Sequence, residues 1–467
     1  MTTEDPRADA KLVFRGGTLE LYCRTPETPA PPAFSFDARV RALRAPASAY
    51  AELVLWAREN AITLDDQARR YDVLAPPHVK LAPLRDYQRE ALAAWMQSRG
   101  PKELASRGLV VLPTGAGKTH VAIAAIAKRL RSTLVVAPTL ELVRQWVERL
   151  HEAFDLPIGV VGGGSHDVQP ITVTTYDSAH LHMEHLGARF GMLVFDECHH
   201  LPTESYAFAA RGSIAPFRLG LTATPERHDG AEDPYLDLIG PTLFRKDIVE
   251  LSGSALASYE TNKISVELED DERREHDEAR ALYRAFVAQH RIAMGSPRGF
   301  QTFLRMTASS REGQRALAAY RLQRRLGLFG AGKLRALAKL LGDHRSDRVL
   351  IFTEDNQAAH RISAEFLLPV LTHRTKVKER VALMADFRSG VLPVLVTSKV
   401  LNEGVDVPEA NVAIVVSGSG SVREHVQRLG RVLRAREGKR AILYELVTAD
   451  SSDEGRSARR REHSAYR

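Results

Sequence analysis

The sequence has very little cysteine: Cys23 and Cys198 are the only two among 467 residues. Two thiols are too few for a disulfide framework or a four-thiolate metal site, and such low usage favours a reducing compartment. No apolar run approaches the roughly 20 residues that a membrane helix needs. The first residues (MTTEDPRADA) also lack the pattern of a signal peptide. We therefore expect a cytoplasmic protein that makes no membrane contact.

The chain also lacks the biased composition of disordered, collagen-like or disulfide-stapled proteins. Hydrophobic residues make up 44% of it and charged residues 26%, which is ordinary for globular domains. At a nominal ~150 residues per domain, the length predicts about three domains.

The net positive charge of the chain is small, but the basic residues are unevenly distributed along the sequence. The net charge of +7 over 467 residues is weak support for a polyanionic partner. Residues 1–80 carry eleven basic and eleven acidic side chains, and residues 267–278 carry eight acids against two arginines. Residues 311–348 hold ten Lys/Arg against three acids, an excess as large as that of the whole protein. Such a run indicates either a solvated helix face or a surface that binds a polyanion.

Short apolar runs alternate with helical stretches in two blocks, and this pattern predicts an α/β fold with two parallel sheets. In the first block we expect strands at 109–112, 134–137, 171–174, 192–195 and 218–221, with helices at 120–130 and 141–151 between them. In the second block we expect strands at 349–352, 394–397, 412–416 and 441–447.

The remaining segments lack this alternation. Strand signals disappear between about 251 and 330, where residues 280–328 indicate a protruding helical insert. Residues 1–80 form a separate piece, with a hairpin expected near 11–22 and a proline-rich break at 26–32. We therefore divide the chain into an N-terminal domain (1–80), a first α/β domain (81–250), a helical insert (251–330) and a second α/β domain (331–467).

A glycine-rich loop lies between an apolar strand and an Ala/Ile-rich helix. Its residues are Pro113, Thr114, Gly115, Ala116, Gly117, Lys118 and Thr119. Glycines let the backbone wrap a phosphate, and the following helix presents free N–H groups at its positive end. Lys118 would reach the β- and γ-phosphates, and the Thr119 hydroxyl would bind Mg²⁺. The strict P-loop pattern has glycine at position 112, where this chain has leucine, but the strand–loop–helix context predicts a phosphate site.

A second apolar strand ends in the acids Asp196 and Glu197, 78 residues after Lys118. Both should lie at the carboxyl edge of the sheet, where open α/β folds bind ligands. Asp196 is suited to hold Mg²⁺, and Glu197 is suited to accept a proton from an attacking water. The Cys198-His199-His200 run that follows lacks the spacing of metal ligands, so we exclude a metal site there.

These two features belong to a larger set of motifs that resembles the superfamily 2 helicases. In order, the set is LRDYQ (84–88), PTGAGKT (113–119), APTL (137–140), DECH (196–199), LTATP (221–225), IFT (351–353), TSKVLNEGVDVP (397–408) and QRLGRVLR (427–434). More narrowly, RLGLTATPERHDG (218–230), SGSGS (417–421) and the arginine-rich C-terminus resemble the XPB family in its short archaeal and bacterial form.

The resemblance implies two RecA-like motor domains, a small N-terminal domain like a damage-recognition domain, and a thumb-like helical insert. It implies an ATP-dependent DNA helicase or translocase of 3′-to-5′ polarity, with ATP and Mg²⁺ as cofactors, that opens duplex DNA in nucleotide excision repair. It also implies binding of single-stranded and duplex DNA, and a nuclease as a partner.

The resemblance further assigns roles at the nucleotide site. Gln88 would hydrogen-bond the adenine edge. Arg431 and Arg434 lie three residues apart on one helix face and would stabilise the transferring phosphoryl group, with Gln427 in the same motif. Beyond the P-loop, the residues expected to line the nucleotide cleft are Arg85, Gln88, Gly404 and Asp406.

A motor that moves along any sequence should hold DNA through hydroxyl, backbone and basic groups. Four threonines just beyond strand ends occupy matching positions on the presumed DNA face, although each alone is more often a helix cap: Thr139, Thr175, Thr353 and Thr397. The other expected DNA contacts are Arg227 and Asp229 after the LTATP motif, Arg374, and the segment residues Arg321, Arg324 and Arg325. Between Arg227 and Asp229, His228 replaces the central acid of the family triplet.

Two other functions stay open at the level of the sequence. An RNA-remodelling ATPase of the same superfamily would share these motifs, and a comparison of single-stranded DNA, duplex and RNA as stimulants of ATP hydrolysis separates it. The second alternative is a scaffold that holds a nuclease on DNA and uses ATP only as a clamp. The presence of Lys118, Glu197, Arg431 and Arg434 argues against a scaffold.

Overall fold

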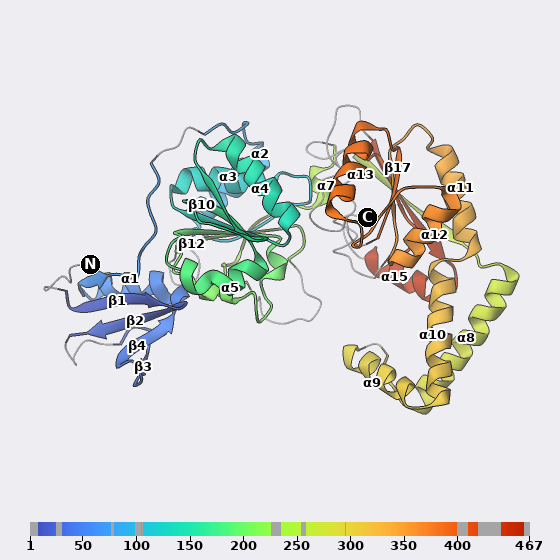
Figure 1. Ribbon diagram of the computed structural model, residues 1–467, viewed down its shortest axis with the longest axis horizontal. Helices are drawn as coiled ribbons and strands as arrows, with labels where there is room; N and C mark the ends of the chain where they lie inside the picture. The colour runs from blue at the N-terminus through green and yellow to red at the C-terminus, as the bar shows by residue number, and fades with distance from the viewer. Residues whose placement is uncertain are drawn as a thin grey trace. The chain divides into compact units, whose positions relative to one another are not determined.

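The protein is described from a computed structural model. The structure describes residues 8–24, 30–75, 79–98, 104, 106–225, 235–253, 258–294, 296–398, 410–418 and 440–461. It divides into two compact units, Met1–Asp247 and Ile248–Arg467. Figure 1 shows both units and labels some of their helices and strands.

The first unit begins with a five-stranded sheet in the order β3-β4-β2-β1-β5 (blue in Figure 1). The expected hairpin is confirmed: β1 and β2 are antiparallel, with Ala10 opposite Cys23 and Arg15 opposite Thr18. The elements of this domain are β1 (Ala10–Arg15), β2 (Thr18–Cys23), β3 (Ser35–Asp37), β4 (Ala42–Pro46), η1 (Ala47–Ala49), α1 (Tyr50–Glu59) and β5 (Leu64–Asp66).

One face of this sheet is apolar and buried. Leu19 and Leu21 on β2 pack with Leu53 of α1, and the same cluster includes Ala188 and Ile214 of the following α/β domain. The N-terminal domain is therefore joined to the first α/β domain by a shared hydrophobic core.

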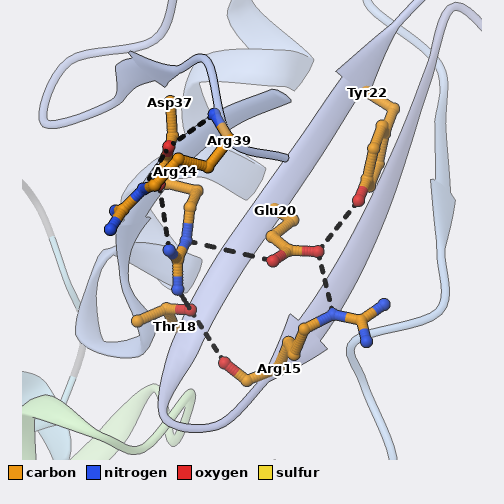
Figure 2. Close-up of polar contacts among 7 residues, drawn as sticks. All are labelled: Arg15, Thr18, Glu20, Tyr22, Asp37, Arg39 and Arg44. Carbon is orange, nitrogen blue, oxygen red and sulfur yellow. Dashed lines mark hydrogen bonds and ion pairs between the residues drawn. The ribbon is translucent and has the colours of Figure 1, made fainter. Parts of the chain in front are cut away.

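The other face of the sheet carries a network of charged side chains (Figure 2). Glu20 on β2 is only 1% exposed, and its Oε2 accepts a hydrogen bond from Arg15 Nε at 3.0 Å. Asp37 on β3 accepts hydrogen bonds from Arg39 and Arg44, which hold the pKa of its carboxyl well below its usual range. Basic and acidic side chains that cancel in the sequence of this domain thus pair with each other in the fold.

The first α/β domain is an eight-stranded sheet in the order β13-β6-β12-β11-β7-β10-β8-β9, parallel except for β9. All five strands expected from the sequence are present, and their buried apolar runs form the core of the domain. The strands are β6 (Arg107–Val111), β7 (Thr133–Ala137), β8 (Ile158–Gly162), β9 (Ser165–Asp167), β10 (Ile171–Thr175), β11 (Met192–Asp196), β12 (Phe217–Thr222) and β13 (Thr242–Arg245). The helical segments are α2 (Asp86–Gln97), α3 (Lys118–Arg129), α4 (Leu140–Ala153), α5 (Tyr176–Leu186), η3 (Cys198–His200) and α6 (Phe208–Arg211).

The second unit contains a six-stranded parallel sheet in the order β14-β19-β18-β15-β17-β16. The four strands expected here are also present, so the α/β class with two parallel sheets is confirmed. The strands are β14 (Ser258–Val266), β15 (Val349–Phe352), β16 (Val370–Leu371), β17 (Val394–Thr397), β18 (Val412–Val415) and β19 (Arg440–Thr448). The helices that belong with them are α7 (Ile248–Leu251), α11 (Ala331–Asp343), α12 (Asn356–Phe366), α13 (Val377–Ser389) and α15 (Ser452–Arg460).

The insert is helical over α8 (Asp270–Gln289), α9 (Pro297–Ala308) and α10 (Arg311–Leu328), drawn in yellow in Figure 1. It has its own small core, in which Phe286 and Phe303 are buried and Tyr283 and Tyr320 are packed against them. The helices of the insert are therefore held together by contacts between aromatic side chains.

The expectation that strands are absent from 251–330 is wrong. Residues Ser258–Val266 form β14, a nine-residue strand that pairs in parallel with β19 along its whole length. The segment reads SYETNKISV, without an apolar run, because β14 is the edge strand of the sheet and most of its described side chains are half-buried. Edge strands carry polar residues that central parallel strands exclude.

None of the helices in the described part of the chain combines the length and the apolar character that crossing a bilayer requires.

Candidate nucleotide site

The glycine-rich loop runs from the end of β6 to the first turn of α3. Gly115 and Gly117 have φ angles of +87° and +79°, in the left-handed region that favours glycine. A Cβ added at Gly117 would lie 2.4 Å from Gln88 Nε2. The loop therefore keeps its backbone free of side chains at the N-terminus of a 12-residue helix, where unbonded amides attract anions.

The carboxylates of Asp196 and Glu197 lie at the end of strand β11. The Lys118 side chain connects the glycine-rich loop to these acids. The Lys118 ammonium donates to the Leu112 carbonyl at 3.2 Å and lies 3.8 Å from Glu197 Oε1. Its side chain is 9% exposed, so the positive charge is held inside the site before a phosphate arrives.

Asp196 is buried and fixed by neighbours that the sequence did not indicate. Its Oδ2 accepts from Trp146 Nε1 at 2.8 Å, and Tyr176 donates its hydroxyl to the Asp196 carbonyl at 2.9 Å. Burial, together with the charge of Glu197, raises the pKa of the Asp196 carboxyl to about 6. A carboxylate that is costly to ionise here is well placed to be stabilised by a cation.

Glu197 has φ +46° and ψ +52°, a left-handed conformation that turns its side chain away from the strand direction. Its Oε2 is buried without a hydrogen-bond partner among the described residues and lies 3.5 Å from His199 Nδ1. That His199 nitrogen is also 3.3 Å from the Thr222 hydroxyl, which accepts from the Thr224 amide at 3.2 Å. The acidic motif is thereby connected to the LTATP motif on β12, and sequence reasoning assigned His199 no role.

Gln88 and Tyr87 hold helix α2 against the phosphate loop. Gln88 Oε1 accepts from the Arg85 amide at 2.9 Å, and its Nε2 donates to the Ala116 carbonyl at 3.0 Å. The Tyr87 hydroxyl donates to the same carbonyl at 2.7 Å. The contact of Gln88 with adenine stays a prediction, but its side chain already couples its motif to the P-loop.

The residues present fit a magnesium nucleotide. The buried Thr114 hydroxyl, like Glu197 Oε2, has no hydrogen-bond partner among the described residues, and a bound ligand would satisfy such groups. Pro113 and Ala116 shape the loop, and Thr119 lies half-buried on the first turn of α3. The donors of the loop, the ammonium and the paired acids are the groups that a nucleotide triphosphate and Mg²⁺ require.

The hydroxyls of the four threonines expected to contact DNA are used inside the protein. Thr139 and Thr175 cap α4 and α5, accepting from the Leu142 and Ser178 amides. Thr353 and Thr397 are fully buried, and their hydroxyls donate to the backbone carbonyls of Asp355 at 2.9 Å and Ser398 at 3.3 Å. Arg374 is exposed. DNA contact by these residues stays a prediction.

The basic segment 311–348 presents less charge to solvent than its sequence suggests. Lys333 is buried against Asp453, and Arg324 and Arg335 form ion pairs with Glu354 and Glu269. Arg321 and Arg325 remain exposed on α10. The net charge of the segment therefore overstates the charge available to a polyanion.

Several predicted site residues lie outside the described residues: Arg227, His228, Asp229, Gly404, Asp406, Gln427, Arg431 and Arg434. Their roles stay predictions.

Three families match parts of the chain. Residues 81–227 match "Type III restriction enzyme, res subunit", residues 332–436 match "Helicase conserved C-terminal domain", and residues 12–68 match "Xeroderma pigmentosum group B helicase damage recognition domain". Together with the nucleotide site and the two parallel sheets, these matches define an ATP-dependent helicase of superfamily 2.

Relatives identify the family within that class. The chain is 38% identical over 432 residues to "DNA 3'-5' translocase XPB2" of Sulfurisphaera tokodaii, covering 92% of this chain and 96% of that protein. It is 31% identical over 391 residues to "DNA 3'-5' helicase XPB" of Mycobacterium tuberculosis, covering 81% of this chain and 63% of that protein. The chain belongs to the XPB family of DNA helicases.

Solved structures share the fold at low identity. The Pyrococcus furiosus Hef helicase domain matches with a TM-score of 0.51 and 19% identity, over 80% of this chain and 97% of that one. Saccharomyces cerevisiae Dbp5 bound to RNA and ADP BeF3 matches with a TM-score of 0.55 and 15% identity, over 81% and 86%. These matches agree with two RecA-like domains.

Replacing Asp196 by Asn should stabilise the nucleotide-free protein while removing the carboxylate that is predicted to bind magnesium. Because the pKa of Asp196 is raised from 3.8 to about 6, its ionisation costs stability as pH rises between these values. Above pH 6 the variant should be more stable than the wild type by about 1–3 kcal/mol and should therefore unfold at a higher temperature. This difference should vanish near pH 4. Thermal unfolding from pH 4 to 8 measures this. A variant less stable than the wild type at pH 7.5 would contradict the assigned burial cost.

Proposed function

We propose that the protein is a 3′-to-5′ DNA translocase that opens duplex DNA by hydrolysing ATP, and that it acts in nucleotide excision repair with a nuclease partner. The observation that supports it most is Glu197, whose Oε2 is buried and whose Oε1 lies 3.8 Å from Lys118 Nζ. The chain that carries this site aligns over 92% of its length with a protein named a DNA 3′-5′ translocase. A site that holds the Lys118 ammonium in place beside a carboxylate oxygen free to accept a proton suits hydrolysis of a nucleotide better than its storage.

The roles of the site residues follow from their chemistry. The loop amides and Lys118 hold the phosphates, and Glu197 accepts the proton of the attacking water. Thr119 and Asp196 would hold Mg²⁺, which would offset charge on the phosphates. His199 links Glu197 to Thr222 and so transmits its position to the LTATP motif. In this proposal Arg431 and Arg434 stabilise charge on the transferring phosphoryl group, with Gln427, Gly404 and Asp406 in the same cleft.

The repair role rests on the family and on the N-terminal domain. Residues 12–68 match a family described as a damage recognition domain, and a Saccharomyces cerevisiae relative is named a "General transcription and DNA repair factor IIH helicase/translocase subunit". A nuclease partner would convert an opened duplex into an incision. A cytoplasmic location stays a prediction from the two cysteines, which are both free thiols.

ATP hydrolysis with single-stranded DNA, duplex DNA and RNA as stimulants tests the substrate class. We expect DNA to raise the turnover rate and RNA to have little effect. Polarity is tested on duplexes with a 3′ or a 5′ single-stranded flank, where only the 3′ flank should support strand separation. Stimulation by RNA alone would favour the RNA-remodelling alternative.

A further inference from the structure

Two hollows flank helix α10 at the base of the insert, and both lie within the second unit. The first, about 650 Å³, lies between the insert and the start of α12, and the second, about 510 Å³, lies between α8, α10 and α15. Phe300, Tyr320 and Arg324 line both of them. We call the two hollows together the α10 groove.

The α10 groove is strongly basic. Its described lining residues include one acid, Asp355, in the first hollow and none in the second. Eight arginines from α8, α10, α12 and α15 line it: Arg280, Arg284, Arg321, Arg324, Arg325, Arg361, Arg456 and Arg459. The tertiary structure thus collects charge from helices up to 180 residues apart, including α8, whose first half is acidic.

Glu354 neutralises part of this positive charge and fixes two of the arginines in place. Its carboxylate pairs with Arg324 of α10 and accepts from Arg456 of α15 at 2.8 Å, and it is only 10% exposed. Its amide donates to the Ser417 hydroxyl at 3.0 Å. Glu354 follows β15, so it connects the insert and α15 to the carboxyl edge of the second sheet.

The other arginines of the second hollow form no ion pair with a carboxylate of the described residues. Arg280 donates to the Asp450 carbonyl at 3.1 Å, a contact that does not neutralise it. Arg284 and Arg459 are exposed at the second hollow. A concentration of guanidinium groups around a recess favours a phosphate-bearing ligand.

Aromatic rings stand among these arginines. Tyr283 and Tyr320 line the second hollow with ring centroids 5.1 Å apart, and Phe300 lies 6.0 Å from Tyr320. All three side chains are half-buried, so part of each remains accessible. Guanidinium groups next to accessible rings are the combination that binds single-stranded nucleic acid, through phosphates and stacked bases.

We propose that a single strand of DNA runs through the α10 groove, with phosphates on Arg284 and Arg459 and bases against Tyr283 and Tyr320. Glu354 is the positioning residue that holds Arg324 and Arg456 in place. A single strand fits better than a duplex, because each hollow has the volume of a small-molecule site and only unpaired bases can stack on the half-buried rings. The inference deepens the proposed function and rests on it.

The test measures binding of a fluorescent oligo(dT) to the full chain by anisotropy, without nucleotide, over a range of salt concentrations. Arg284→Ala with Arg459→Ala should weaken binding about tenfold and reduce the log–log salt slope by about 1.4, near 0.7 per phosphate contact. The matched control is Lys339→Ala with Arg345→Ala, which removes two exposed charges of the basic segment outside the groove. Equal losses for the two double variants would overturn the inference.

Two further measurements separate the possible outcomes. An oligonucleotide with photoreactive 5-iodouracil should crosslink to Tyr283 or Tyr320, and crosslinks confined to other regions would overturn the placement. Glu354→Ala should weaken binding and Glu354→Gln should restore part of it; a fall in unfolding temperature with an unchanged salt slope would make Glu354 merely structural.

The result is distinguishable from failure of the proposed function. A wild-type protein stimulated by DNA, with groove variants that bind like the control, would refute the groove alone. A wild-type protein that DNA does not stimulate would refute the motor. Binding of oligo(U) but not oligo(dT) through Arg284 and Arg459 would make RNA the occupant, and wild-type affinity of the groove variants would leave an acidic protein partner as the occupant instead.

Discussion

We expect replacement of Glu197 by Gln to lower ATP turnover by about 10²–10⁴-fold, the range of general base catalysis, while the protein still binds nucleotide. Glutamine keeps the shape of the side chain but cannot accept a proton at neutral pH. The site makes this loss specific, because Glu197 Oε2 is buried and has no hydrogen-bond partner among the described residues. The Lys118 contacts that would hold phosphate do not depend on that oxygen, since Lys118 also donates to the Leu112 carbonyl.

Two assays measure turnover and nucleotide binding separately. They are steady-state ATP hydrolysis in the presence of DNA and equilibrium binding of a fluorescent ATP analogue. Glu204→Gln is the matched control, since Glu204 is exposed seven residues further along the chain and should leave both unchanged. Turnover of Glu197→Gln at the wild-type rate would assign the base to another group. Wild-type activity of this variant in a coupled incision assay would favour the scaffold alternative.

Replacing Lys333 by Met destabilises the second unit by about 3–5 kcal/mol, the usual cost of breaking a buried ion pair. Lys333 and Asp453 are 1% and 0% exposed, and their charged atoms lie 2.6 Å apart. Lys333 also donates to the Val416 carbonyl at 2.6 Å, so it joins α11 both to the residue that follows β18 and to α15. Methionine fills the same volume, so the cost comes from leaving the Asp453 carboxylate buried without its cation.

Urea unfolding followed by circular dichroism measures the change. Arg335→Met is the control on the same helix, where the removed charge is 67% exposed and pairs with Glu269, so the loss should stay below about 1 kcal/mol. The double variant Lys333→Met with Asp453→Leu should recover much of the stability, because neither charge of this buried pair is then left without the other. Equal losses for Lys333→Met and Arg335→Met would show that the buried pair does not stabilise the fold.

The strands that carry the nucleotide site were predictable because of where they lie. Central strands such as β11 and β15 are covered on both faces, so they must be continuous apolar runs, and the acids and threonines that follow them mark the edge. Strand β14 was not predicted because it is an edge strand in which polar residues interrupt any apolar run. The pattern of apolar residues in a sequence reflects burial, and an edge strand is buried too little to produce a recognisable pattern.

The contacts that hold the site could not be predicted. Trp146 lies fifty residues from Asp196, and His199 stood in a Cys-His-His run that we considered only as a metal site. Cys198 next to it is fully buried in the hydrophobic core of the first α/β domain. Partners of this kind depend on which strands become neighbours, and spacing along the chain contains no information on that.

By itself the sequence determined the class of fold, the P-loop, the acidic pair and the family, because each depends on residues that are close together or on apolar runs that burial requires. It also placed an excess of positive charge at 311–348. Only the tertiary structure decided what that charge does: Lys333 is neutralised inside the core, Arg324 pairs with Glu354, and arginines from α8 and α15 collect around α10. Net charge is additive along a chain, whereas the field at a surface depends on which charges are buried, paired or brought together by folding.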